Sequence, residues 1–300
     1  MAGGQERILR RRIRSVQATK KITRAMELIA ASQIVRAQNR IAAAAPYESA
    51  IAGLLGEVAA DSTTGAGRLL GVPEHPAHVL VLAVVADRGL CGAYNTSVLR
   101  TVERLVQAGK EQGTAFRVVT VGRKAISYLR FRGQELEATF TGFTDRPTFE
   151  DAREVAAALT GPFLAEEVDQ VLVVSTRFHS AGSQSVETRQ LLPLPVGESG
   201  EEDGSPRRAG YTEFEPDAVE LLAQLVPLYA EAMIQGTLLE AAASEHTARQ
   251  RAMAAATDNA DELAKTLSRI MNRARQDAIT TEIMEIVGGA EALRQSASAG

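Results

Sequence analysis

The sequence predicts an α/β domain inserted between two long helices that pair with each other as an antiparallel coiled coil. Three observations lead to this fold class. Apolar residues recur at helical spacing over residues 5–58. Runs of β-type residues alternate with helical stretches over residues 77–195. After Pro227 the 300-residue chain has no further proline, and its apolar residues follow a heptad-like spacing.

The first segment, residues 1–60, predicts one long amphipathic helix. Pro46 is its only proline, and we expect a kink there because proline lacks an N–H donor and clashes with the preceding turn. Residues 61–76 are rich in residues that break helices and strands, and they predict a linker. The apolar side chains of the helix are Leu9, Ile13, Val16, Ile22, Met26 and Ile29.

The middle segment, residues 77–213, predicts a Rossmann-like α/β domain with a mainly parallel sheet, because strands and helices alternate along it. Within it, residues 196–210 are polar, and we expect a flexible surface loop there. The β-type runs cover residues 78–86, 116–122, 169–178 and 186–195. The helical stretches lie near residues 94–110, 123–131 and 148–160.

The last segment, residues 214–300, predicts the second long helix, which starts near Glu215–Pro216 because proline fits a first helical turn. Sixty or more helical residues would make a rod of about 100 Å, which a domain of this size cannot bury. The predicted seam turns polar at residues 275–277. Its apolar positions are Leu263, Leu267, Ile270, Ala274, Ile279, Ile283, Ile286, Ala290 and Leu293.

Charge is distributed unevenly, although the net charge is only −4. Residues 1–40 carry ten Lys and Arg against two Glu, whereas residues 213–293 carry fourteen Asp and Glu against six Lys and Arg. Opposite charges favour pairing of the two helices. Salt screens exposed charges, so the apolar seam must supply most of the stability.

Composition argues against several classes of protein. A single cysteine excludes an internal disulfide and argues against a zinc cage. The longest apolar run, Val79–Ala86, is far shorter than the ~18 residues of a membrane-spanning helix. The Arg-rich N-terminus superficially resembles a transit peptide, but its helical pattern continues into the body of the chain, so we interpret it as mature structure.

The stretch "VVADRGLCGAYN", residues 84–95, raises the question of an active site. Its glycines have neither the G-x-G-x-x-G spacing of dinucleotide sites nor the spacing of phosphate-binding loops. Cys91 as a nucleophile would need a base, and His179, which follows a predicted strand, is the candidate. We favour a small buried thiol in a glycine turn, and an enzyme built on the α/β domain stays an alternative.

A nucleic-acid-binding coiled coil is the second alternative. The basic N-terminal helix has the charge to neutralise phosphates. The chain offers few aromatic side chains for base stacking, since aromatic residues make up 4% and Trp is absent. Glu282 and Glu285 lie three apart on one helical face, but an extended rod has no cleft to raise their pKa. We interpret them as surface or partner contacts.

Four segments together resemble the gamma subunit of bacterial rotary F-type ATP synthases, and the resemblance covers essentially the whole chain. The most specific pattern, I-T-x-E-x-x-E-x-x-x-G-A-x-A, spans Ile279 to Ala292 at the end of a long helix. The four segments are "ITRAMELIAAS" (22–32), "ADRGLCGAYN" (86–95), "AATDNA" (255–260) and "RARQDAITTEIMEIVGGAEAL" (273–293).

This resemblance implies a central rotor shaft without an active site or cofactor of its own. The helix pair would turn inside a ring of alternating alpha and beta subunits, and ATP would be made or hydrolysed on beta. The α/β domain would lie outside that ring, near the membrane c-ring and the epsilon subunit. The location implied is the cytoplasmic face of the bacterial plasma membrane.

The resemblance also implies contact residues for beta-subunit loops. Arg275 and Gln276 match a pair that hydrogen-bonds a beta loop, and Thr280, Glu282 and Glu285 match supporting polar positions nearby. In the glycine turn, Asp87, Arg88 and Cys91 are candidate contacts for the beta levers.

The N-terminal helix supplies further candidates. Met26 matches a methionine near the beta levers, although the same position also fits the apolar seam. Lys20, Lys21 and Arg24 are either partners of acidic levers or simply solvated. Because Cys91 is the only cysteine, the regulatory dithiol of the chloroplast form is not expected here.

Overall fold

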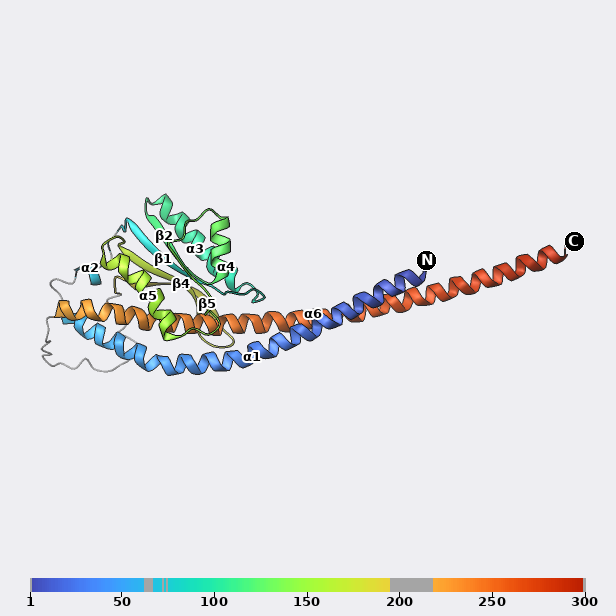
Figure 1. Ribbon diagram of the computed structural model, residues 1–300, viewed down its shortest axis with the longest axis horizontal. Coiled ribbons are helices and arrows are strands. Elements are labelled where there is room, and N and C mark those ends of the chain that lie inside the picture. Colours follow the sequence, from blue (N-terminus) through green and yellow to red (C-terminus); the bar gives the residue numbers. More distant parts are fainter. Residues whose placement is uncertain (1, 62–66, 72, 74, 195–217, 299–300) are drawn as a thin grey trace. The chain divides into compact units, whose positions relative to one another are not determined.

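The computed structural model describes residues 2–61, 67–71, 73, 75–194 and 218–298 (Figure 1). The chain forms two compact units, one of residues 1–29 with 251–300 and the other of residues 30–250. Two helices contribute to both units: α1, Ala2–Asp61, and α6, Ala218–Ser298. The long N-terminal and C-terminal helices predicted from the sequence are therefore confirmed.

In the first unit, α1 and α6 pair in antiparallel fashion. The hydroxyls of Thr23 and Thr257 lie 2.8 Å apart, and Lys20 hydrogen-bonds Asp261. As the residue number increases along α1, the number of the residue opposite it on α6 decreases, so the two helices are antiparallel. Lys265 also binds Asp261, at 2.8 Å. Hydrogen bonds from Lys20 and Lys265 lower the pKa of Asp261 to about 2.

The seam between these helices differs from the predicted one. Leu263 and Ile270 on α6 and Ile22 on α1 are exposed, whereas Thr23 is buried opposite Thr257. Small side chains such as Thr23 and Ala264 let two helices approach closely, and the bulky residues Ile22 and Leu263, each one position away, face outward. The buried residues of this unit are Ile13, Thr23, Met253, Thr257, Ala260, Ala264 and Leu267, and those on α6 alternate four and three apart.

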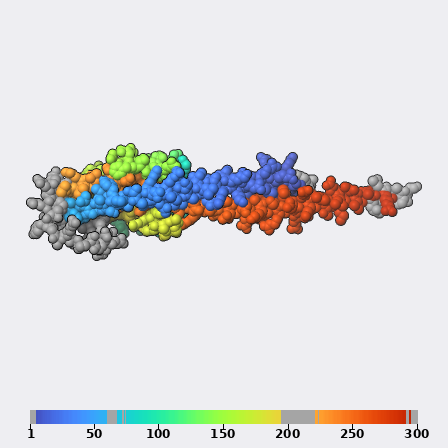
Figure 2. All heavy atoms as spheres, turned by 90° about the horizontal axis from the view of Figure 1, so that it is seen from below, coloured from blue at the N-terminus to red at the C-terminus, as the bar shows by residue number. Residues whose placement is uncertain are grey.

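Helix α6 continues past the N-terminal end of α1, as Figures 1 and 2 show. Every residue from 281 to 290 is exposed. The predicted seam residues Ile279, Ile283 and Ile286 are therefore not covered by α1, because α1 has no turn opposite them. The side chain of Leu293 lies outside the described residues.

The second unit contains a five-stranded sheet in the order β3-β2-β1-β4-β5. Strands β1 to β4 are parallel, and β5 pairs antiparallel with β4. The strands are β1 His78–Val84, β2 Ala115–Val121, β3 Ala138–Phe140, β4 Gln170–Phe178 and β5 Gln184–Leu192. The mainly parallel sheet is confirmed; β3 was not predicted, because three residues are too few to show a period.

Helices cover both faces of this sheet. Leu80, Leu82 and Val84 of β1 pack on the side of α5, α1 and α6, and the alternate residues Val79 and Val81 pack on the side of α3 and α4 (Figure 1). Burial on both faces explains why β1 is a continuous apolar run. The helices are α3 Tyr94–Glu111, α4 Arg123–Phe131 and α5 Phe149–Leu164.

Some of the segments that connect the helices and strands differ from those predicted from the sequence. Helix α1 includes Pro46 and stays helical to Asp61. The predicted linker contains a helical turn, α2, Gly67–Leu70. The polar stretch 196–210 and the predicted helix start at Glu215–Pro216 lie outside the described residues. The four-segment division at residues 60, 76 and 213 stays a prediction.

Replacement of Gly53 by alanine is expected to stabilise the protein. Gly53 is an exposed residue inside α1, and a Cβ there would meet no atom within 4 Å. Alanine restricts the unfolded chain and favours the helix by about 0.5–1 kcal/mol. Chemical denaturation of the two proteins measures this gain. Gly109→Ala is the contrast: its Cβ would lie 1.9 Å from the Phe116 ring, so a loss of about 1–3 kcal/mol is expected.

Candidate functional site

The carboxyl ends of the parallel strands, where ligands bind in open α/β sheets, are occupied by the carboxylate of Asp87. This carboxylate accepts the backbone N–H groups of Arg123 at 3.1 Å and Gly142 at 2.7 Å, and the hydroxyl of Thr144 at 3.2 Å. The side chain is 8% exposed. Asp87 therefore ties together the segments that follow β1, β2 and β3.

The turn after β2 closes this edge further. Gly122 has φ of +100°, and a Cβ there would lie 2.2 Å from the carbonyl oxygen of Val85. The two backbones are thus in direct contact, and Asp87 takes the place next to the start of α4 that a bound anion occupies in nucleotide-binding folds. The chain's own groups leave no phosphate cradle at this edge within the described residues.

The thiol of Cys91 lacks the environment of a nucleophile. It is 1% exposed, and it accepts a hydrogen bond from the Asn95 side-chain amide at 3.2 Å. Burial raises the pKa of the Cys91 thiol, whereas reactive cysteines have a lowered one. His179, the candidate base, hydrogen-bonds Ser185 at 2.8 Å, and no contact with Cys91 is found within the described part of the chain.

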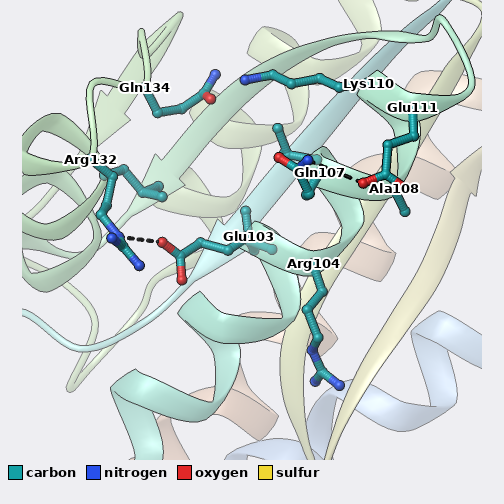
Figure 3. A pocket seen from close by; sticks show the side chains of 11 residues that line it. Glu103, Arg104, Gln107, Ala108, Lys110, Glu111, Arg132 and Gln134 are labelled. Atoms are coloured by element: carbon teal, nitrogen blue, oxygen red, sulfur yellow. Dashed lines mark hydrogen bonds and ion pairs between the residues drawn. The ribbon is translucent and has the colours of Figure 1, made fainter.

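A pocket of about 610 Å³ lies along α3 and the chain that follows α4 (Figure 3). Its polar side chains mostly pair with one another. Arg132 binds Glu103 at 2.7 Å, and Gln107 donates to Glu111 at 3.2 Å. Figure 3 shows Arg104 directed away from these pairs. Because its carboxylates already have partners, this pocket offers no converging set of free polar groups for chemistry among the residues that the structure describes.

The tip of the glycine turn faces solvent. Arg88 is exposed, and Leu90 is 62% exposed with φ of +64°. A non-glycine residue in this conformation is uncommon and costs about 1 kcal/mol or more. Leu90 does not stand out in the sequence, since only its backbone conformation and exposure distinguish it from a core leucine.

This turn is anchored on α6 by buried polar groups. Arg249 donates to the carbonyl of Gly89 at 3.3 Å and pairs with Glu245 at 2.7 Å. The Tyr94 hydroxyl donates to the carbonyl of Ala241 at 3.1 Å. The side chains of Glu245 and Arg249 are 2% and 12% exposed. The turn is therefore held rigidly beneath an exposed tip.

The candidates on α1 lie in the first unit and differ in exposure. Met26 is half-buried, and Lys21 is exposed. Lys20 is engaged with Asp261, and Arg24 pairs with Glu27 at 2.7 Å. Of these cations, Lys21 has no ion pair within the described ranges, so it is the most available to a partner.

The candidates on α6 share an exposed stretch of the same unit. Arg275, Gln276, Thr280, Glu282 and Glu285 are all exposed. The Thr280 hydroxyl donates to the carbonyl of Gln276 at 3.0 Å. Neither Arg275 nor the two glutamates form an ion pair with any residue that the structure describes. The structure thus groups these five with Met26 in one unit, and Asp87, Arg88 and Cys91 in the other.

Comparison with known proteins explains why the described residues include exposed candidate contacts on α1, on α6 and in the glycine turn, but no set of catalytic residues. The family model described as ATP synthase matches residues 5–293. The ATP synthase gamma chain of Parafrankia sp. (strain EAN1pec) is 46% identical over 98% of this chain and 99% of that relative. The gamma chain of Acidothermus cellulolyticus is 48% identical over 97% and 98%. The chain belongs to the ATP synthase gamma-chain family.

Solved structures share the fold of this chain. A chain of the Euglena gracilis mitochondrial ATP synthase, in an assembly described as OSCP/F1/c-ring, aligns with a TM-score of 0.69 at 18% identity, over 99% of this chain and 97% of that one. A chain from the central stalk/c-ring of the Tetrahymena thermophila enzyme aligns with a TM-score of 0.59 at 23% identity, over 78% and 99%.

A gamma chain is a non-catalytic stalk subunit, the rotor shaft that couples ion flow to ATP synthesis or hydrolysis. This role agrees with the position of the Asp87 carboxylate, which occupies the carboxyl ends of the strands, and with the burial of the Cys91 thiol. The relatives named here are ATP synthase subunits, and they lend no support to the nucleic-acid alternative. Within the described residues, no helix has the length and apolar character needed to cross a bilayer.

Proposed function

We propose that the helix pair of this gamma chain turns inside a ring of alternating alpha and beta subunits. One observation carries the proposal: in the first unit many bulky apolar side chains face outward, although the seam between the two helices buries only a few residues, several of them small. Full burial of each such side chain is worth roughly 1.5–3 kcal/mol, so the surface favours an enclosing partner. Its members that are more than half exposed are Ile8, Ile22, Leu28, Ile29, Ile283, Met284, Ile286 and Val287.

Such a surface suits a rotating contact. Apolar contacts are non-directional, so they hold a shaft without binding it strongly at one angle. The surface also differs around its circumference, because α1 contributes a side rich in Lys and Arg, whereas α6 contributes a side of mixed charge. A ligand shifts a conformational equilibrium only if it contacts the states unequally. An asymmetric shaft can therefore favour different conformations of the three beta subunits in turn.

Contacts with beta subunits are proposed for three places on this gamma chain. Arg275 and Gln276, supported by Thr280, Glu282 and Glu285, would hydrogen-bond a beta-subunit loop. The glycine turn would meet a beta lever through Arg88, with Asp87 and Cys91 holding the turn from below; the 1% exposure of Cys91 leaves its thiol no surface for direct contact. Met26 and Lys21 would meet a lever from α1, while Lys20 and Arg24 already have intrachain partners.

The α/β domain is proposed to face epsilon and the c-ring, on the cytoplasmic side of the bacterial plasma membrane. Support comes from the Tetrahymena assembly, which is described as central stalk and c-ring together. The finding that no described helix could span a bilayer agrees with a peripheral position.

Purification of the tagged chain from native membranes tests the proposed function. We expect a nucleotide-hydrolysing assembly several times larger than the chain, containing alpha, beta and epsilon, and no turnover by the pure chain alone. Recovery of the chain with nucleic acid would instead support the basic coiled-coil alternative. Turnover by the pure chain would support an enzyme, and either result overturns the shaft assignment.

A further inference from the structure

A polar cluster in the second unit joins three elements that are otherwise packed through apolar side chains. Arg189 of β5 donates to the Thr237 hydroxyl at 3.0 Å and pairs with Glu240 at 3.4 Å, both on α6. The side chains of Arg189 and Glu240 are 23% and 19% exposed. Thr237 is buried and donates its hydroxyl to the carbonyl of Met233 at 2.8 Å. One arginine thus connects the sheet to two adjacent turns of α6.

Helix α1 enters the same cluster through Glu48. A Cβ on Gly236 of α6 would lie 2.6 Å from one Glu48 carboxylate oxygen and 3.0 Å from the carboxyl carbon. The carboxylate therefore rests on bare helix backbone, in a place that only glycine leaves open. Burial raises the pKa of Glu48, and the nearby charges of Arg189 and Arg177 oppose this effect.

Directional contacts at this place restrict movements that the surrounding core does not. The core on this side of the sheet contains many Ala, Val and Leu residues from α1, α5 and α6. Apolar packing is non-directional and similar side chains recur along a helix, so it resists turning or sliding of a helix less than fixed hydrogen bonds do. Arg189 fixes the rotation of α6, and the fit of Glu48 against Gly236 fixes α1 along α6.

We propose that Glu48, Arg189, Gly236 and Glu240 form a torque joint, which locks the rotation of the two long helices to the sheet domain. This inference rests on the proposed shaft function. A shaft transmits rotation only if its helices cannot turn or slide independently of the domain at its base. The four residues are positioning residues: they contact no substrate, and they act by keeping the helices and the sheet in register.

The test uses the complete ATP synthase in inverted membrane vesicles. Gly236→Ala and Arg189→Met are compared with wild type by the ATP-driven membrane potential per ATP hydrolysed, at equal gamma-chain content. We expect hydrolysis to continue while the potential per ATP falls about fivefold or more, the range typical of lost coupling between sites. A change in folding alone would alter the amount of assembled enzyme, and this ratio would stay constant.

Matched controls make the same chemical changes elsewhere in the second unit. Gly53→Ala adds a methyl group to α1 in open space. Arg117→Met removes an arginine of β2 that pairs with Glu137 and Glu167 and, among the described residues, with neither long helix. Both controls should couple as wild type does. Because Gly236→Ala creates a clash with Glu48, the added change Glu48→Asp, one methylene shorter, should restore part of the coupling.

The outcomes separate this inference from the proposed function. If the joint variants couple as well as their controls, the torque joint is wrong while the shaft function stands. Should wild-type vesicles that depend on this chain generate no ATP-driven potential, the shaft function itself fails, and the joint with it. If Arg189→Met does not assemble, Arg189→Lys keeps the charge and loses the planar fork, and a normal ratio in that variant also contradicts the joint.

Discussion

Replacement of both Arg275 and Gln276 by alanine is expected to remove most coupled ATP synthesis while leaving the assembly intact. Both side chains are exposed, and such surface substitutions usually change folding stability by no more than about 0.5 kcal/mol. Loss of a charged hydrogen bond to a partner costs about 2–5 kcal/mol, so a drop of at least tenfold in synthesis is expected. Synthesis rates in energised vesicles, normalised to gamma-chain content, measure this drop.

Arg273→Ala is the matched control for this pair. Arg273 is also exposed on α6, two residues before the pair and outside the positions that match the family contact. It should leave synthesis near the wild-type rate. An unchanged rate in the Arg275 and Gln276 double variant would contradict the role proposed for this pair, and equal losses in the control would show that charge on this stretch matters rather than these two side chains.

The fold was predictable where periodicity is strong. Strands β1, β2, β4 and β5 follow long β-type runs, and their predicted ranges overlap the observed ones. The helix seam was less predictable, because hydrophobicity alone assigns Ile22 rather than Thr23 to a buried position. Thr23 can be buried because its hydroxyl bonds the Lys20 carbonyl on its own helix at 3.1 Å and the Thr257 hydroxyl on the opposite helix at 2.8 Å. A single sequence gives no information about that partner.

The surroundings of the glycine turn were less predictable from the sequence than the turn itself. Asp87 and Cys91 stand out as residue types, but the contacts that define them come from Gly142 and Asn95. Arg249 lies 160 positions from Gly89 and carries no motif of its own. Contacts of this kind depend on the three-dimensional placement of α6, which local patterns do not encode.

Arg249→Met is expected to produce the largest loss of stability in the second unit. The Glu245 carboxylate, 2% exposed, would lose its partner at 2.7 Å, and the Gly89 carbonyl would lose its donor. Breaking a buried ion pair from one side costs about 3–5 kcal/mol, because the remaining charge stays buried. Denaturant unfolding of the isolated chain measures this loss. The double variant Glu245→Met, Arg249→Met buries no charge and should recover much of the stability.

The same variant should show a distinctive dependence on pH. Burial raises the pKa of Glu245 from its ordinary value of 4.5, and Arg249 opposes this rise. A raised carboxyl pKa means that the folded state holds the proton more tightly, so the associated stability is complete below about 4.5 and is lost as pH rises through the folded-state pKa. Without Arg249 that pKa rises further. The deficit of Arg249→Met relative to wild type should therefore be largest near neutral pH and shrink as Glu245 becomes protonated. A deficit that is constant with pH would indicate that lost packing of the arginine side chain, and not the unpaired carboxylate, causes the instability.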